Sequence, residues 1–154
     1  MTDAPADVID VFVSALARVL RASLGEPARF AGLHISRDVD PAPAVAVTIE
    51  LSGSLRGPVT WVFSPDLARV LATRMMMSED VPAECVADAV AELSNIVTGN
   101  ATGPLLDAGF AIEITPPTIY DSERDRQLPT DTLVATVSAA CGIARVYLDL
   151  EVAA

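Results

Sequence analysis

The sequence has few of the side chains on which most enzyme active sites depend. It contains one histidine, His34, and two cysteines, Cys85 and Cys141, which lie far apart in the chain. This composition argues against a zinc site built from paired cysteines or from a cysteine–histidine cluster, and it leaves any histidine-assisted nucleophile to His34 alone. We therefore expect His34 to be an ordinary strand residue and both cysteines to be buried, reduced thiols.

Positive charge is scarce as well. Ten lysine and arginine residues stand against 21 acidic residues, which gives a formal net charge of −11. Such a surface repels phosphate backbones and anionic lipid headgroups, so nucleic acid and membrane are poor partners. No apolar run approaches the roughly 18 residues that span a bilayer, and the start, MTDAPADVIDVF, has no basic region before its apolar residues. We expect a soluble, cytoplasmic protein.

Apolar residues, by contrast, are plentiful. They make up 51% of the 154 residues, and the mean hydropathy is +0.42. A chain of this length and composition can bury a sizeable core, and its length is typical of one domain, residues 1–154.

Apolar spacings of three and four residues predict three helices. They run from about Asp7 to Leu24, from Pro65 to about Met76, and from beyond Pro82 to about Leu106. Gly25 would end the first helix, and Ser64 would cap the second. Met75, Met76 and Met77 at the end of the second helix are expected to fill the core and pack the helix end. The alternative is an adaptable binding surface.

Alternating apolar residues predict the strands. The pattern begins at Phe30 and continues in Val45–Ile49, Val59–Phe63, Ile112–Ile114, Leu133–Ser138 and Ala144–Leu150. Helices and hairpins in this order predict an α+β domain with a mostly antiparallel sheet covered by helices.

The third predicted helix has two unlike faces at about 100° per residue. Its apolar arc holds Cys85, Val86, Ala89, Val90, Leu93, Ile96 and Val97. Its outer arc holds Asp88, Asn95, Thr98, Gly99 and Thr102, with Glu92 at the border. We expect the first arc to face the core and the second to face out. Asn100 falls in the apolar arc and is expected to be a buried amide bonded to nearby backbone.

The outer arc contains residues that weaken a helix. A glycine in mid-helix costs roughly 1 kcal/mol relative to alanine, and asparagine about half as much. Gly99 lies next to both Glu92 and Asn95, where it would let the backbone of another macromolecule come close. The alternative is a solvated face with an accidental glycine.

A carboxylate and an amide alone make half of an active site. Neither Glu92 nor Asn95 is a strong nucleophile, and no cluster of oxygen ligands accompanies them. An amide can, however, hold a water for in-line attack, as a glutamine does in small GTPases. The electrophile, the metal and the base would then come from a partner, and an independent metal hydrolase is disfavoured.

Three segments carry a resemblance to a known family. They are Glu92-Leu93-Ser94-Asn95-Ile96-Val97 followed by Gly99-Asn100-Ala101, the paired Met75-Met76, and Ile114-Thr115-Pro116-Pro117-Thr118. Over roughly Val45 to Leu150, the sequence resembles the CheX members of the CheC/CheX/FliY group of chemotaxis phosphatases. One Glu-x-x-Asn helix favours CheX, because CheC proteins usually carry two and FliY proteins add a flagellar switch domain. The family commonly has glycine after the paired methionines, where this chain has Met77.

The resemblance implies a function in chemotaxis or related two-component signalling. Family members hydrolyse the aspartyl phosphate of the response regulator CheY. It implies that Asn95 positions the attacking water and that Glu92 engages the regulator's active-site lysine, while Asp88, Gly99 and Thr102 of the same face meet the partner. The chain needs no cofactor of its own, since Mg²⁺ is expected on the regulator.

Two further expectations follow. The resemblance implies a homodimer, and the apolar strands at Val45–Ile49 and Leu133–Val137 are expected to leave an open sheet edge for it. The alternative to the enzyme is a non-catalytic CheX-like module that docks a signalling protein. Retention of both Glu92 and Asn95 favours the enzyme, because docking alone has no evident need for the amide.

Overall fold

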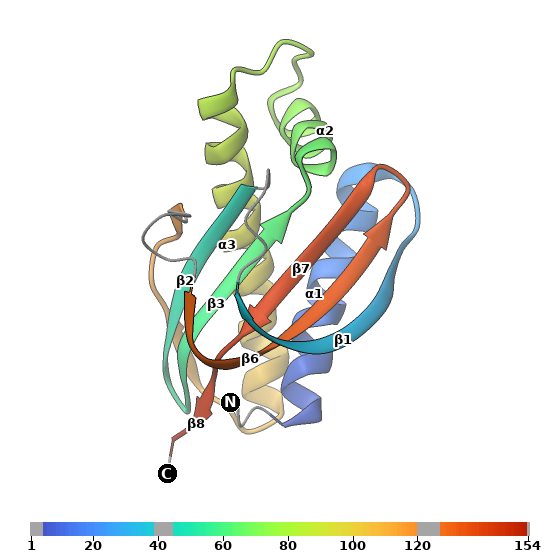
Figure 1. Ribbon diagram of the computed structural model, residues 1–154. Helices are drawn as coiled ribbons and strands as arrows, with labels where there is room; N and C mark the ends of the chain where they lie inside the picture. The colour runs from blue at the N-terminus through green and yellow to red at the C-terminus, as the bar shows by residue number, and fades with distance from the viewer. Residues whose placement is uncertain (1–4, 39–44, 120–126, 154) are drawn as a thin grey trace.

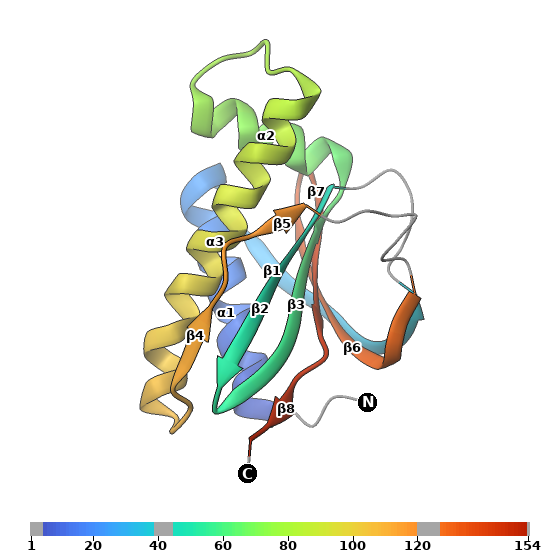
Figure 2. The ribbon, with the colours of Figure 1, turned by 90° about the vertical axis from the view of Figure 1, so that its left-hand side faces the viewer.

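The protein folds as one sheet with three helices on one of its faces (Figures 1 and 2). The computed structural model describes residues 5–38, 45–119 and 127–153. In chain order the elements are α1 (Ala6–Leu24), β1 (Ala28–Asp38), β2 (Val45–Gly53), β3 (Leu55–Phe63), α2 (Pro65–Met76), α3 (Ala83–Asp107), β4 (Ile112–Ile114), β5 (Thr118–Ile119), β6 (Gln127–Ala139), β7 (Gly142–Leu148) and β8 (Glu151–Val152). No helix within the described ranges is both long and apolar enough to cross a membrane.

The strands pair in the order β1-β6-β7-β3-β2-β4, with β5 against β2 and β8 against β3. Every pairing among the described strands is antiparallel. The predicted α+β class, a mostly antiparallel sheet covered by helices, is confirmed.

The core lies between the helices and the inner face of the sheet. Alternate residues of the central strands supply large buried side chains: Val47, Ile49, Val59, Trp61, Phe63, Val146 and Leu148. The helices meet them with Phe12, Leu16 and Leu20 of α1, Leu67 and Leu71 of α2, and Val90, Leu93, Val97 and Leu105 of α3. α3 is therefore held along its inner side, and its outer side is left to the surface (Figure 2).

The helix ends follow the predicted signals, with one difference. Gly25 ends α1 in the left-handed conformation, at φ 68°, and its N–H donates to the carbonyl of Arg21. α2 begins at Pro65 as predicted, but the hydroxyl of Ser64 does not cap it. That oxygen instead accepts a hydrogen bond of 3.1 Å from the N–H of Ile143, which ties the start of α2 to β7.

The three methionines at the end of α2 differ in environment. Met75 is half-buried against the core, whereas Met76 is 47% exposed and Met77 is 93% exposed. The prediction of core filling is therefore wrong for Met76 and Met77. Met77 caps α2 in the left-handed conformation, at φ 52° and ψ 39°, and its N–H donates to the carbonyl of Thr73. A methionine thus makes the turn for which glycine is the less strained choice.

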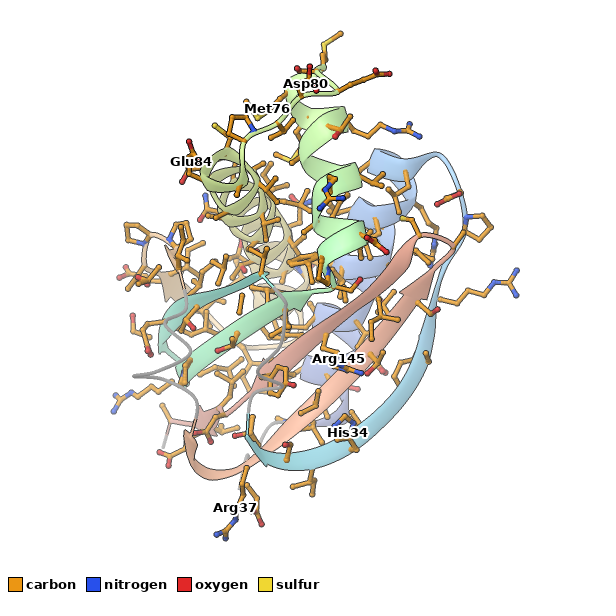
Figure 3. All side chains as sticks on the ribbon, turned by 45° about the horizontal axis from the view of Figure 1, so that its top comes forward. His34, Arg37, Met76, Asp80, Glu84 and Arg145 are labelled. Atoms are coloured by element: carbon orange, nitrogen blue, oxygen red, sulfur yellow. The ribbon has the colours of Figure 1, made fainter. Side chains whose placement is uncertain are left out.

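The edge of the sheet is not where the sequence pattern placed it. β2 lies between β3 and the pair β4 and β5, and β6 lies between β1 and β7, so neither predicted strand is an open edge. β1 and β4 stand at the two ends of the strand order, and β1 carries three exposed apolar side chains, Phe30, Leu33 and Ile35. His34 lies on the same strand, paired with Val134, as an exposed strand residue (Figure 3).

The cysteines are free thiols but are less buried than predicted. Cys85 and Cys141 are both half-buried. Burial raises the pKa of the Cys141 thiol, and the nearby carboxylate of Glu26 raises it further.

Candidate functional site

The residues singled out in the sequence lie on a single helix, α3. Glu92 is exposed and Asn95 is half-buried, three residues further along. Asp88, one turn before Glu92, is exposed, and Gly99 and Thr102, on the following turns, are half-buried. None of the five is in the core, so α3 brings them all to its outer side, as the helical period predicted.

Thr98 does not belong to this outer face. Its side chain is fully buried, and its hydroxyl accepts a hydrogen bond of 2.9 Å from the indole N–H of Trp61 on β3. The same hydroxyl donates to the carbonyl of Ser94 at 2.7 Å. The prediction that Thr98 faces out is wrong because a hydroxyl that bonds to the preceding turn and to an indole can be buried without an unsatisfied group.

Asn100 and Ile96 are placed opposite to their predictions. Asn100 is exposed and, with Pro104, lines a shallow groove beside Ser14 and Arg18 of α1, so it is not a buried structural amide. Ile96, predicted to face the core, is 41% exposed next to Asn95. The face that α3 buries is thus turned toward Ser94 and Thr98 and away from Ile96. The indole of Trp61 needs an acceptor there, and Thr98 supplies it.

Gly99 is not required by the packing of the chain itself. A Cβ added at Gly99 would meet nothing within 4 Å, and the same holds for Gly103 one turn later. The hydroxyl of Thr102 donates to the carbonyl of Gly99 at 2.7 Å, which leaves its oxygen free to accept. The helix therefore carries a destabilising glycine one turn from Asn95, and the packing of the chain gives no reason for it.

The charge of α3 is of one sign. The helix carries four carboxylates, Glu84, Asp88, Glu92 and Asp107, and no basic residue. The first three follow at intervals of four and so lie on neighbouring turns, beginning in the first turn of α3 with Glu84, which is labelled in Figure 3. A phosphoryl group brought to Asn95 would be repelled unless cations came with it.

No metal site accompanies this face. Within residues 5–38, 45–119 and 127–153, no group of three or more histidine, cysteine or acidic side chains could hold a metal ion. The geometry provides an amide that can hold a water and a carboxylate that can meet a cation. It provides no nucleophile of its own.

The segment after α3 runs along β2. Ile114 of β4 pairs with Leu51, and Thr118 of β5 pairs with Thr48. Between them Thr115 makes two hydrogen bonds with the backbone of Glu50: its N–H donates to the carbonyl at 3.1 Å, and its hydroxyl accepts from the N–H at 3.0 Å. The two prolines that follow lack N–H groups, so the ladder is interrupted there.

The supporting roles of three residues, Trp61, Ser94 and Thr98, were missed in the sequence, although each left a signal. Trp61 is the only tryptophan and points inward from a strand, where its N–H must find an acceptor. Ser94 and Thr98, four residues apart, each donate to the carbonyl four residues earlier, a pattern that lets hydroxyls face a core.

Comparison with known proteins places the fold. A crystal structure of the chemotaxis protein CheX from Vibrio vulnificus matches with a TM-score of 0.79 and 22% identity, over 95% of this chain and 100% of that one. A CheX–CheY–BeF₃–Mg²⁺ complex from Borrelia burgdorferi matches with a TM-score of 0.74 and 24% identity, over 96% and 99% of the two chains. FliY from Thermotoga maritima matches with a TM-score of 0.70 and 20% identity, over 97% and 92%.

The family follows from the sequence itself. No curated protein sequence matches the chain. The family model described as chemotaxis phosphatase CheX matches residues 45–136, which is more than half of the 154 residues and includes Glu92 and Asn95. The structural matches agree with it in fold, and the chain therefore belongs to the CheX family of chemotaxis phosphatases.

Proposed function

We propose that this protein hydrolyses the aspartyl phosphate of a phosphorylated CheY-like response regulator in the cytoplasm. The observation that carries the proposal is the half-site on α3, where Glu92 and Asn95 lie three residues apart on the outer side of a helix with no basic residue. Such a face cannot neutralise a phosphoryl group alone and needs a partner that brings cations. The relative from Borrelia burgdorferi, in complex with CheY, supports this class of partner.

The amide of Asn95 would position the attacking water. Its carbonyl oxygen can accept a hydrogen bond from the water, and its NH₂ can donate to a phosphoryl oxygen. The water oxygen forms a new bond to phosphorus as the bond from phosphorus to the aspartyl oxygen breaks, and the water proton passes to the phosphate. The products are inorganic phosphate and the free aspartate of the regulator. Holding the water in line is a contribution of position, which needs no strong base.

The other residues of the face would dock the regulator. Glu92 is placed to meet the regulator's active-site lysine, and Asp88 adds charge of the same sign one turn away. Gly99 lets the partner backbone approach, and Thr102 offers an acceptor beside it. The regulator would supply the phosphorylated aspartate and Mg²⁺.

The test compares the two asparagines of α3. Asn95→Ala should lower kcat for phosphate release from phosphorylated receiver domains by about 10²-fold, the scale of losing one preorganised transition-state contact, while binding persists. Asn100→Ala is the matched control, since it removes an exposed amide five residues away on the same helix. Release near the wild-type rate in a folded Asn95→Ala protein that still binds would refute the assignment.

The same assay separates the enzyme from a docking module. A wild-type protein that binds phosphorylated receiver domains but releases no phosphate from any of the host's receivers would be a non-catalytic module. The panel of receivers also identifies the substrate.

We also propose that the protein is a homodimer. The support is β1, an edge strand with exposed Phe30, Leu33 and Ile35, because an apolar edge of this kind is normally covered. Light scattering at micromolar concentration should give twice the mass of 16.1 kDa. A monomeric mass would remove the dimer and leave the half-site intact.

A further inference from the structure

A chain of two buried hydrogen bonds runs from the sheet to the backbone of Asn95. The indole N–H of Trp61 donates to the hydroxyl of Thr98 at 2.9 Å, and that hydroxyl donates to the carbonyl of Ser94 at 2.7 Å. Trp61, Thr98 and Ser94 are all fully buried. Water therefore cannot replace either bond, and loss of the hydroxyl would leave a buried donor without its partner.

The carbonyl of Ser94, the last acceptor in this pair of hydrogen bonds, belongs to the peptide group that links Ser94 to Asn95. The C=O of Ser94 and the N–H of Asn95 lie in one rigid unit that ends at the Cα of Asn95. A helix carbonyl ordinarily accepts only from the N–H four residues on. Here the carbonyl also accepts from the hydroxyl of Thr98, so the tilt of this one peptide is held from the core side of the helix.

Trp61, whose indole donates the first of these two hydrogen bonds, is itself held in place. Trp61 lies on β3 between β2 and β7, opposite Val47 and Val146. Its ring packs against Phe12 of α1, with centroids 6.1 Å apart and planes inclined by 56°. α3 is therefore tied through Thr98 to an interior strand of the sheet.

We propose that Thr98 is a positioning residue for the amide of Asn95 and acts through the Ser94 carbonyl. This inference rests on the proposed phosphatase function. The direction of the Cα–Cβ bond of Asn95 follows the peptide that Thr98 restrains. An amide that holds water for in-line attack tolerates little displacement, since about 1 Å of misplacement costs on the order of 10²-fold in rate. Thr98 touches neither water nor phosphate and acts only by holding the turn that carries Asn95.

The kinetic test uses variants that differ in the hydroxyl. Thr98→Val keeps the shape and removes the hydroxyl; it should lower kcat by about tenfold with KM unchanged, because Glu92 and Gly99 still dock the receiver. Thr98→Ser keeps the hydroxyl and should restore kcat to within about twofold of wild type. Should the valine variant fail to fold, Thr98→Ala against Thr98→Ser makes the same comparison, because these two differ only in the oxygen.

A second measurement on the free protein keeps this inference separate from the phosphatase proposal. The single tryptophan gives one indole N–H resonance, and ¹⁵N relaxation reports the order of the Asn95 amides. Thr98→Val should shift the indole resonance and lower the order at Asn95, whereas Thr98→Ser should do neither.

The outcomes are distinct. Absence of phosphate release by the wild type would sink the proposed function, and the relaxation data would still decide whether Thr98 positions Asn95. An unaltered kcat in Thr98→Val with an active wild type, or undisturbed Asn95 amides in that variant, would overturn the inference. A lower melting temperature with kcat preserved would assign Thr98 to stability alone.

Discussion

Gly99→Ala separates the stability of α3 from its use by a partner. An added Cβ would meet no atom within 4 Å, so in the free protein the substitution acts only through helix propensity. Alanine is favoured over glycine in a helix interior by about 0.8–1 kcal/mol. For a chain of this size, that gain corresponds to a melting temperature higher by roughly 2–4 °C.

Docking should respond in the opposite direction. The new methyl group would lie one turn from Asn95, in the space that a receiver backbone is proposed to enter. Crowding a close contact by one methyl costs about 1–3 kcal/mol, which is roughly a five- to 150-fold rise in KM. The variant should therefore be more stable than wild type and a poorer enzyme at low receiver concentration.

Gly103→Ala is the control for the effect on docking. It lies one turn further along the exposed side of α3, and an added Cβ there also meets nothing within 4 Å. It should leave KM unchanged, but its gain in stability should be smaller than that of Gly99→Ala, because a residue with a Cβ directly before Pro104 is disfavoured in the helical conformation. Thermal melting and phosphate release against receiver concentration, on both variants, decide the matter. Equal KM values for wild type and Gly99→Ala would refute the proposal that Gly99 lets the receiver backbone come close. A loss of stability in Gly99→Ala would refute the conclusion that the space around Gly99 is open in the free protein.

Two more predictions concern residues away from the site. Met77→Gly should stabilise the protein by about 0.5–1 kcal/mol in guanidinium unfolding. It removes the strain of a left-handed residue, about 1–2 kcal/mol, but loses about 0.4–1 kcal/mol because glycine raises the entropy of the unfolded chain. Met77→Ala keeps the strain and should gain nothing, so equal gains for the two variants would contradict the reasoning. Alkylation of Cys141 by iodoacetamide, followed by mass spectrometry, should need a higher pH than a free thiol needs, because burial and Glu26 raise its pKa and the thiolate is the reactive form. Glu26→Gln should move that pH profile down, and an unmoved profile would leave burial as the sole cause.

The helices and the candidate site could be predicted from the sequence because both depend on residues that are close together in the chain. Glu92 and Asn95 lie within one helix, so the period of 3.6 places them side by side whatever the rest of the fold does. Gly25 ends α1 where the pattern predicted, because glycine alone takes the left-handed conformation without strain. The α+β class followed in the same way, from the order of helical and alternating segments.

Which side of α3 is buried was decided by the tertiary structure. Thr98 can lie in the core, with Ile96 exposed, because its hydroxyl is satisfied there by the indole of Trp61, which is 37 residues earlier in the chain. The edge of the sheet was decided likewise, since the pairing of β1 with β6 joins residues about a hundred positions apart. Pairings of that range depend on every element that lies between them, so the apolar pattern of a single strand does not reveal whether its neighbours will cover it.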